Sequence, residues 1–195
     1  MATLQVKVTD TADDGYEVFG SLTNMQFGVG YAGGATFLLY CRFLNVTVPQ
    51  GATIDSATLT LNITDISGTP DTTLYGVDED NAAAFTDPGN MPSAATGTTA
   101  SADPDPAGTG SKVITITTIV QEIVDRAGWA SGNAMAFVAG DNAGSGNNYW
   151  FAEDYEDAGT AEATLDITYT VASAAGPLAT GKLVGRGILG GRLIA

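Results

Sequence analysis

The sequence predicts an all-β fold, an antiparallel β-sandwich of the jelly-roll type with one short helix and an extended C-terminal tail. Apolar and polar side chains alternate over residues 57–64 and 165–171, which is the two-residue period of a strand with one buried face. About nine short segments of strand character are separated by turns rich in Gly, Pro, Asn and Asp, as is typical of sandwiches and jelly rolls.

The expected strands follow one another at short intervals along the chain. Residues 37–43 are apolar on both faces, which is typical of a strand at the centre of a sheet. Apart from the two alternating segments, strands are expected at residues 4–8, 16–19, 36–48, 73–77, 112–117, 134–139 and 148–153. Only residues 118–127 indicate a helix, because four aliphatic residues recur there at helical spacing and Gly128 then ends the pattern.

The segment 78–110 does not fit a compact sandwich. It contains four prolines and a run of Ala, Thr, Ser and Gly. Structureless loops longer than about 12–15 residues are uncommon in compact domains unless they are functional or disordered. Within a single jelly-roll domain over residues 1–172, we therefore expect a long loop at 78–110 that either packs on a neighbouring subunit or is disordered.

Residues 173–195 form a second unit, a linker followed by a Gly-rich arm that is basic and aliphatic. Five glycines between residues 181 and 191 disfavour a free helix, since each costs up to about 1 kcal/mol relative to Ala. The arm has too little apolar area to fold alone, so it is expected to bind a groove on a partner as an added strand or extended arm. A frayed terminus is the alternative. The residues expected to make this assembly contact are Lys182, Leu183, Val184, Arg186, Ile188, Leu189, Arg192, Leu193 and Ile194.

Charge is divided unevenly between these two units. The sequence has 22 acidic and 7 basic residues, a net charge of −15 at pH 7. Every acidic residue lies at or before Asp166, so residues 1–172 have 22 acidic and four basic residues, or −18, and the arm carries +3. Strong negative charge opposes binding to nucleic acid and to anionic membranes. The opposite charges of the two units suggest an appendage with its own partner.

Few catalytic designs are compatible with this composition. The chain has no His and one Cys, which excludes Ser-His and Cys-His nucleophile pairs, an intramolecular disulfide and a zinc site built from thiolates. Paired carboxylates could cleave a glycoside, but any acidic sandwich contains such pairs. We therefore expect a protein that is not an enzyme and that requires no cofactor.

Calcium is the ion that the sequence leaves open. Asp78, Glu79 and Asp80 are consecutive acidic residues in the expected loop. Calcium takes about 6–8 oxygen ligands, and loops at the end of a sandwich can supply them. The spacing does not match an EF-hand loop, and the alternative is a solvated acidic surface.

Aromatic residues in the last third of the chain could contact a glycan. The candidates are Trp129, Trp150 and Tyr155. Strand alternation places Tyr149 and Phe151 on one face and Trp150 on the other, so some of these rings must belong to the core. Trp129 follows the expected helix, where sealing the edge of the sandwich is the alternative role.

Several segments share a pattern beyond simple periodicity. Residues 37–43 read Phe-Leu-Leu-Tyr-Cys-Arg-Phe, and residues 48–61 combine Pro-Gln-Gly-Ala-Thr-Ile with Ala-Thr-Leu-Thr-Leu. Residues 120–138 contain a helix pattern, a Trp-containing turn and a strand pattern, and residues 150–154 and 163–169 add two more strand patterns. Together these segments resemble the DNRLRE-type jelly-roll domains of bacterial surface proteins, carbohydrate-binding modules and phage-related proteins.

The resemblance covers most of residues 3–171 and implies a jelly roll, whereas the arm lies outside it. Ala152, Glu153 and Asp154 stand where the family usually has a Ser-Arg-Glu type sequence. No secretory signal or apolar stretch long enough to cross a bilayer is visible.

Two functions are compatible with these observations. The first is a non-catalytic structural protein of a phage-like virion, a capsid decoration or tail-associated appendage made in the host cytoplasm. It would bind itself or other virion proteins through its loop and arm. The alternative is a carbohydrate-binding module that attaches to a cell-surface glycan.

Overall fold

The computed structural model describes residues 1–24, 27–104, 106–142, 146–155 and 162–172. The strands of this part of the chain are β1 (Ala2–Lys7), β2 (Asp14–Val18), β3 (Ser21–Thr23), β4 (Phe27–Ala32), β5 (Ala35–Phe43), β6 (Thr53–Ser67), β7 (Thr72–Val77), β8 (Gly97–Ala102), β9 (Gly110–Thr115), β10 (Met135–Asp141), β11 (Asn148–Ala152) and β12 (Thr164–Thr170). The helix is α1 (Thr117–Val124), and single 3-10 turns occupy Thr11–Asp13 and Pro92–Ala94.

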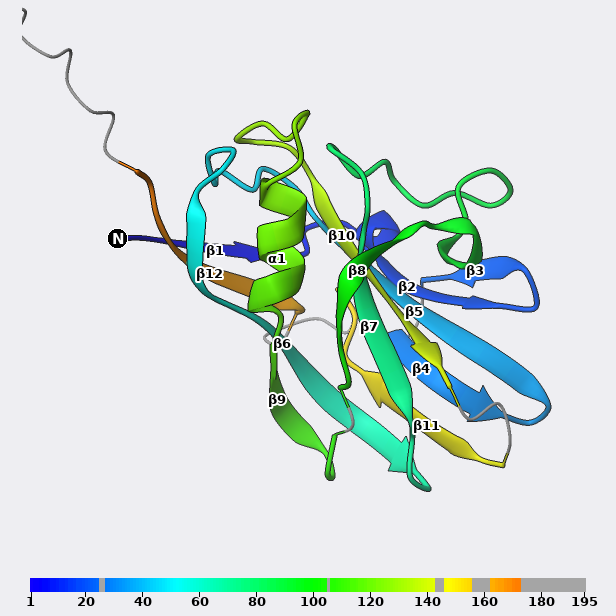
Figure 1. Ribbon diagram of the computed structural model, residues 1–195. Coiled ribbons are helices and arrows are strands. Elements are labelled where there is room, and N and C mark those ends of the chain that lie inside the picture. Colours follow the sequence, from blue (N-terminus) through cyan, green and yellow to red (C-terminus); the bar gives the residue numbers. More distant parts are fainter. Residues whose placement is uncertain (25–26, 105, 143–145, 156–161, 173–195) are drawn as a thin grey trace, which may run out of the picture.

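The strands join antiparallel into one curled sheet. Its main path runs β1-β12-β6-β11-β4-β5-β10-β7-β8, with β2 beside β5, β3 beside β2, and β9 beside β6. The sheet curls so that its two halves face each other (Figure 1). The helix α1 lies at one side of the fold, in contact with β8 and β6. The expected all-β sandwich with one short helix is therefore confirmed.

The apolar side chains that alternate with polar ones in the sequence form the core. Leu59, Leu61 and Ile63 of β6 are buried, and so are Leu165 and Ile167 of the neighbouring β12. Their side chains meet those of β4, β5, β10 and β11 between the two halves of the sheet. Burial of these aliphatic and aromatic side chains is the main stabilising contribution, at roughly 25 cal/mol per Å² of apolar surface.

The helix closes one side of this core. The four aliphatic residues that predicted it, Ile119, Val120, Ile123 and Val124, are all buried. Gly76 of β7 allows the helix to approach, because a β carbon at this position would lie 2.7 Å from Ile123 Cδ1. The helix ends at Val124, earlier than the expected residue 127.

The strand expected at residues 36–48 is shorter in the structure. β5 ends at Phe43, and Asn45 then adopts a φ of +56°, a left-handed conformation that ends a strand. Val46 and Val48 are nevertheless buried. The apolar run therefore continues beyond β5 because Val46 and Val48 enter the core from the irregular segment that follows the strand.

The segment 78–110 is not a structureless loop, and this expectation is wrong for its described residues. Ala82 and Phe85 are buried on the face of the sheet opposite the main core, and the Phe85 ring packs on Tyr40 with centroids 4.8 Å apart. Further along, the segment forms β8, which pairs with β7. The Glu122 carboxylate of α1 accepts hydrogen bonds from Thr99 N at 2.7 Å and Ala100 N at 2.8 Å. The segment thus packs on its own domain, which leaves less of its surface available to contact a neighbouring subunit.

Candidate functional site

The acidic cluster expected to hold calcium is instead bound to a guanidinium. Arg126 Nε donates to Asp80 Oδ1 at 2.8 Å, and its Nη1 donates to Asp78. Glu79 accepts a hydrogen bond from Ala83 N at 3.2 Å. These carboxylates raise the pKa of Arg126 above its usual value, and the hydrogen bond that Arg126 donates to Asp80 is the largest cause. Over the described residues no group of three acidic, His or Cys side chains could hold a metal ion, so the calcium expectation at residues 78–80 is corrected.

Both tryptophans proposed as glycan contacts are buried. Trp129 is 3% exposed and its indole nitrogen donates to Val48 O at 2.9 Å, so it seals the edge of the sandwich. Trp150 is 0% exposed because strand alternation directs it into the main core. The expectation that a sugar stacks on either ring is therefore wrong. Tyr155 is 38% exposed, and its backbone N donates to Asp14 Oδ2 at 3.0 Å.

A cluster of half-buried rings occupies the opposite face from Trp150. Tyr149 and Phe151 lie together there with centroids 5.2 Å apart, as alternation predicts. Phe151 also meets Phe37 at 5.7 Å and Tyr16 at 6.0 Å, with interplanar angles of 73° and 63°. Rings in this edge-to-face arrangement stabilise one another and present few parallel faces to a ligand.

The residues of the expected assembly arm lie outside the described residues. This applies to Lys182, Leu183, Val184, Arg186, Ile188, Leu189, Arg192, Leu193 and Ile194. Their role therefore stays a prediction, and the site must be built from the surface of the sandwich domain that could receive them.

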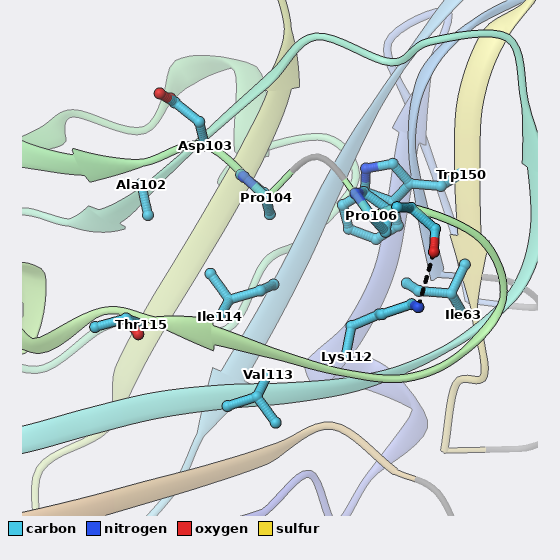
Figure 2. A pocket seen from close by; sticks show the side chains of 11 residues that line it. Ile63, Ala102, Asp103, Pro104, Pro106, Lys112, Val113, Ile114, Thr115 and Trp150 are labelled. Carbon is cyan, nitrogen blue, oxygen red and sulfur yellow. Dashed lines mark hydrogen bonds between the residues drawn. The ribbon is translucent and has the colours of Figure 1, made fainter.

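One of the pockets among the described residues lies along the free edge of β9, and we call it the β9 pocket. Its volume is about 530 Å³. Its walls come from the connection between β8 and β9, from β9 itself, from Ile63 of β6 and from Trp150 of β11 (Figure 2). Most of the lining is aliphatic, namely Ile63, Ala102, Pro104, Pro106, Ala107, Val113 and Ile114.

The polar side chains of the β9 pocket are those of Asp103, Lys112, Thr115 and Trp150. Trp150 Nε1 is buried and has no hydrogen-bond partner among the described residues. Leaving such a group unsatisfied costs about 1–3 kcal/mol. Lys112 Nζ donates to Ala107 O at 3.0 Å (Figure 2). Asp103 also lines the pocket, but its carboxylate points away from Trp150 and Lys112 in this view.

Lys112 also differs from the other described basic residues in lacking an ion pair. Lys7 pairs with Glu162 at 3.1 Å, Arg42 with Asp13 at 2.7 Å, and Arg126 with the acidic cluster at residues 78–80. Lys112 has no carboxylate within ion-pair distance in the described part of the chain. The pocket therefore suits a ligand with an aliphatic body and hydrogen-bond acceptors.

One strand edge beside the pocket is unpaired in the described structure. β9 pairs with β6 on one side, and no described strand pairs with its other side. Val113 of this edge is 66% exposed, a large value for an aliphatic side chain. An exposed edge of this kind offers backbone donors and acceptors to an added strand.

A second exposed apolar feature lies at the tip of the β2–β3 hairpin. Phe19 is 83% exposed and has a φ of +51°. Gly20 follows with a φ of +75°, so the two residues make a tight turn with left-handed backbone at both positions. Asn-Gly is the preferred pair for this turn, and a Phe in its first position is a strained choice that exposes an aromatic ring.

Burial raises the pKa of two further titratable groups, Cys41 and Tyr40. Cys41 is fully buried, and burial raises the pKa of its thiol well above the usual value, with Asp14 adding to the effect. Burial likewise raises the pKa of Tyr40, whose hydroxyl donates to Asn24 Oδ1 at 2.7 Å. A thiol held in its protonated form is a poor nucleophile.

The sequence singles out Trp150 as a possible glycan contact and gives no indication of the other residues that line the β9 pocket. Its walls come from four separate segments, and none of these carries a local pattern that indicates a pocket. One usable indication of the pocket is Lys112, the only basic residue between Arg42 and Arg126, which follows the Pro-rich connection directly.

No protein-family model matches the chain, and no curated protein matches it at a significant level. None of the described helices is long and apolar enough to cross a membrane.

Proposed function

We propose that this chain is a non-catalytic structural protein of a phage-like particle, whose jelly-roll bodies are joined through the basic C-terminal arm. The observation that carries the proposal is the division of charge. Residues 1–172 carry −18, because their four basic residues offset only four of the 22 acidic residues. The arm adds three cations and no carboxylate.

Opposite charges on two parts of one chain favour association between copies. Electrostatic complementarity raises association rates and fixes the partner, while apolar contacts supply most of the affinity. The arm combines both, since aliphatic pairs alternate with its cations. Its glycines make a folded state of its own costly, so a partner surface is the natural place for these side chains.

The strained, exposed Phe19 supports an assembly role as well. Backbone strain at a bulky residue persists where function requires it, and an exposed aromatic side chain is the commonest type of anchor in a protein interface. The choice of a phage-like particle over other assemblies rests on the resemblance to a jelly-roll family that includes phage-related proteins.

Trp129 and Trp150 are buried, so neither ring can stack on a glycan. The half-buried aromatic cluster does not replace them, since its rings pack against each other. We therefore give no second candidate function.

The proposal is tested by removing the charge of the arm without shortening it. We expect the triple variant Lys182→Gln, Arg186→Gln, Arg192→Gln to lose the self-association of the wild-type chain in sedimentation velocity. The matched control Lys182→Arg, Arg186→Lys, Arg192→Lys keeps the charge and should associate as the wild type does. Raising the salt concentration should weaken wild-type association, because the Debye length shrinks from about 10 Å at 0.1 M to about 3 Å at 1 M.

A second experiment addresses the particle. The full chain and the two triple variants are each expressed with the particle, and the amount retained on purified particles is measured. Loss of the Gln variant alone agrees with the proposal. If the Gln variant associates and occupies the particle as the wild type does, the proposed role of the arm is wrong.

A further inference from the structure

We propose that the β9 pocket is the docking site for the C-terminal arm of a neighbouring copy of this chain. This inference deepens the proposed function and rests on it, because it names the surface that receives the arm. The arm would lie extended along the free edge of β9, with an aliphatic pair entering the pocket.

The walls of the pocket match the side chains of the arm. Ile63, Pro104, Pro106 and Ile114 provide an aliphatic lining over a volume of about 530 Å³. The arm presents the aliphatic pairs Leu183/Val184, Ile188/Leu189 and Leu193/Ile194, each separated by Gly and a cation. One pair can fill the pocket while the intervening glycines allow the backbone to approach the edge of the sheet closely.

The backbone groups at the free edge of the site match those of a peptide. No described strand pairs with the outer side of β9, so its backbone donors and acceptors can bind an added segment. An extended segment supplies one carbonyl oxygen at every residue and can exchange hydrogen bonds with this edge. Docking would also cover Val113, which is 66% exposed in the isolated chain.

Charge determines how the arm is placed. Lys112 lies within the pocket and repels the cations of the arm, so an aliphatic pair is the part that can enter. Asp103, at the rim, attracts a neighbouring Arg or Lys. The strongly acidic composition of the domain favours approach of a +3 segment from any direction.

The position of the arm along the chain favours a neighbouring copy over the chain's own pocket. The last paired residue of β12, Thr170, lies opposite Thr53 of β6, whereas the pocket lies near Leu61, which is paired with Lys112. Eight residues along β6 span about 26 Å at 3.3 Å per residue. The eleven residues 171–181 can span at most about 36–40 Å. Reaching its own pocket would use most of this length, whereas docking on a neighbouring copy carries no such requirement.

Disulfide cross-linking tests this geometry directly. One full-length variant carries Val113→Cys, and three others carry Leu183→Cys, Ile188→Cys or Leu193→Cys. Cys41 is fully buried and does not compete. When the Val113→Cys chain is mixed with each arm variant under mild oxidation, we expect a disulfide-linked dimer with at least one of them.

The matched control places the cysteine on a different sheet edge. Thr3 is exposed on β1, which pairs with β12 and with no other described strand. The Thr3→Cys chain should give at least tenfold less cross-linked dimer with the same arm variants. Equal cross-linking at Thr3 and Val113, or none at Val113, would overturn the inference.

Two further outcomes separate the possible failures. A chain carrying both Val113→Cys and an arm cysteine that cross-links only within one monomer at high dilution, while the mixed single variants do not cross-link, would overturn docking on a neighbour. If the arm-charge variants abolish self-association but no cross-link forms at Val113, the proposed function stands and this docking site is wrong. If those variants leave association unchanged, the proposed function itself fails.

Discussion

The α1 side of the sandwich and the β9 pocket treat their polar groups in opposite ways. On the α1 side, Arg126 binds the acidic cluster, Glu122 binds two backbone amides of β8, and Trp129 donates to Val48 O. At the β9 pocket, Trp150 Nε1 has no partner and Lys112 has no ion pair among the described residues. The acidic and aromatic residues of the α1 side thus complete the fold, whereas polar groups without a described partner mark the candidate site.

The largest expected effect concerns the ion pair between Asp13 and Arg42, whose polar groups, like those of the α1 side, have partners within the domain. Asp13 is 3% exposed and accepts from Arg42 Nη1 at 2.7 Å. We expect Asp13→Ala to lower the free energy of unfolding by about 2 kcal/mol, because it leaves a guanidinium that is largely buried without its carboxylate. Urea denaturation measures this loss. The control Asp87→Ala, at an exposed position, should change stability by less than about 0.5 kcal/mol, and equal effects of the two substitutions would contradict the assignment.

The two buried tryptophans differ in whether the indole nitrogen has a hydrogen-bond partner. Trp129→Phe and Trp150→Phe remove the same atoms from buried rings, but only the first breaks a hydrogen bond, the one to Val48 O. We expect Trp129→Phe to cost about 1 kcal/mol more than Trp150→Phe, which is the net value of a typical buried hydrogen bond. Urea denaturation of both variants at pH 7 provides the measurement. Equal losses would show that the Trp150 indole nitrogen has a partner in solution.

The smallest expected effect is that of a surface ion pair. Lys7 donates to Glu162 at 3.1 Å, and this hydrogen bond lowers the pKa of Glu162 below its usual value. A lowered pKa in the folded state stabilises the protein above the unfolded pKa of about 4.3, and this contribution is lost as the pH falls through the folded pKa. We expect Lys7→Gln to cost a few tenths of a kcal/mol at pH 7, as exposed pairs do.

The pH dependence of that variant is its check. Thermal melting curves of the wild type and Lys7→Gln should differ slightly at pH 7 and coincide near pH 3. A difference that is as large at pH 3 as at pH 7 would show that Lys7 acts through packing of its side chain and not through its charge.

The fold could be predicted wherever a local pattern determines burial. The period of two in β6 and β12 and the helical spacing of α1 place the same side chains in the core that the structure buries. The strand β8 could not be predicted, because Gly97–Ala102 is composed of small residues and is stabilised by contacts distant in sequence with β7 and Glu122.

The candidate site depends even more on distant contacts. The acidic run at residues 78–80 reads as a metal site in isolation, and only the fold brings Arg126 to it from 46 residues away. The β9 pocket likewise requires the Pro-rich connection to lie over β9 and Trp150. Sequence proximity identified residues of the right chemical type but not the partners that each would meet.

Docking of the arm at the β9 pocket is tested most directly by the self-association of two matched edge variants. Val113→Lys places a charge at the free edge of β9, and Thr3→Lys places the same charge at the edge of β1, both at exposed positions. Sedimentation velocity of the full-length chains should show that Val113→Lys weakens association at least tenfold while Thr3→Lys associates as the wild type does. Association that is unchanged in both variants, or weakened equally in both, would contradict docking of the arm at the β9 pocket.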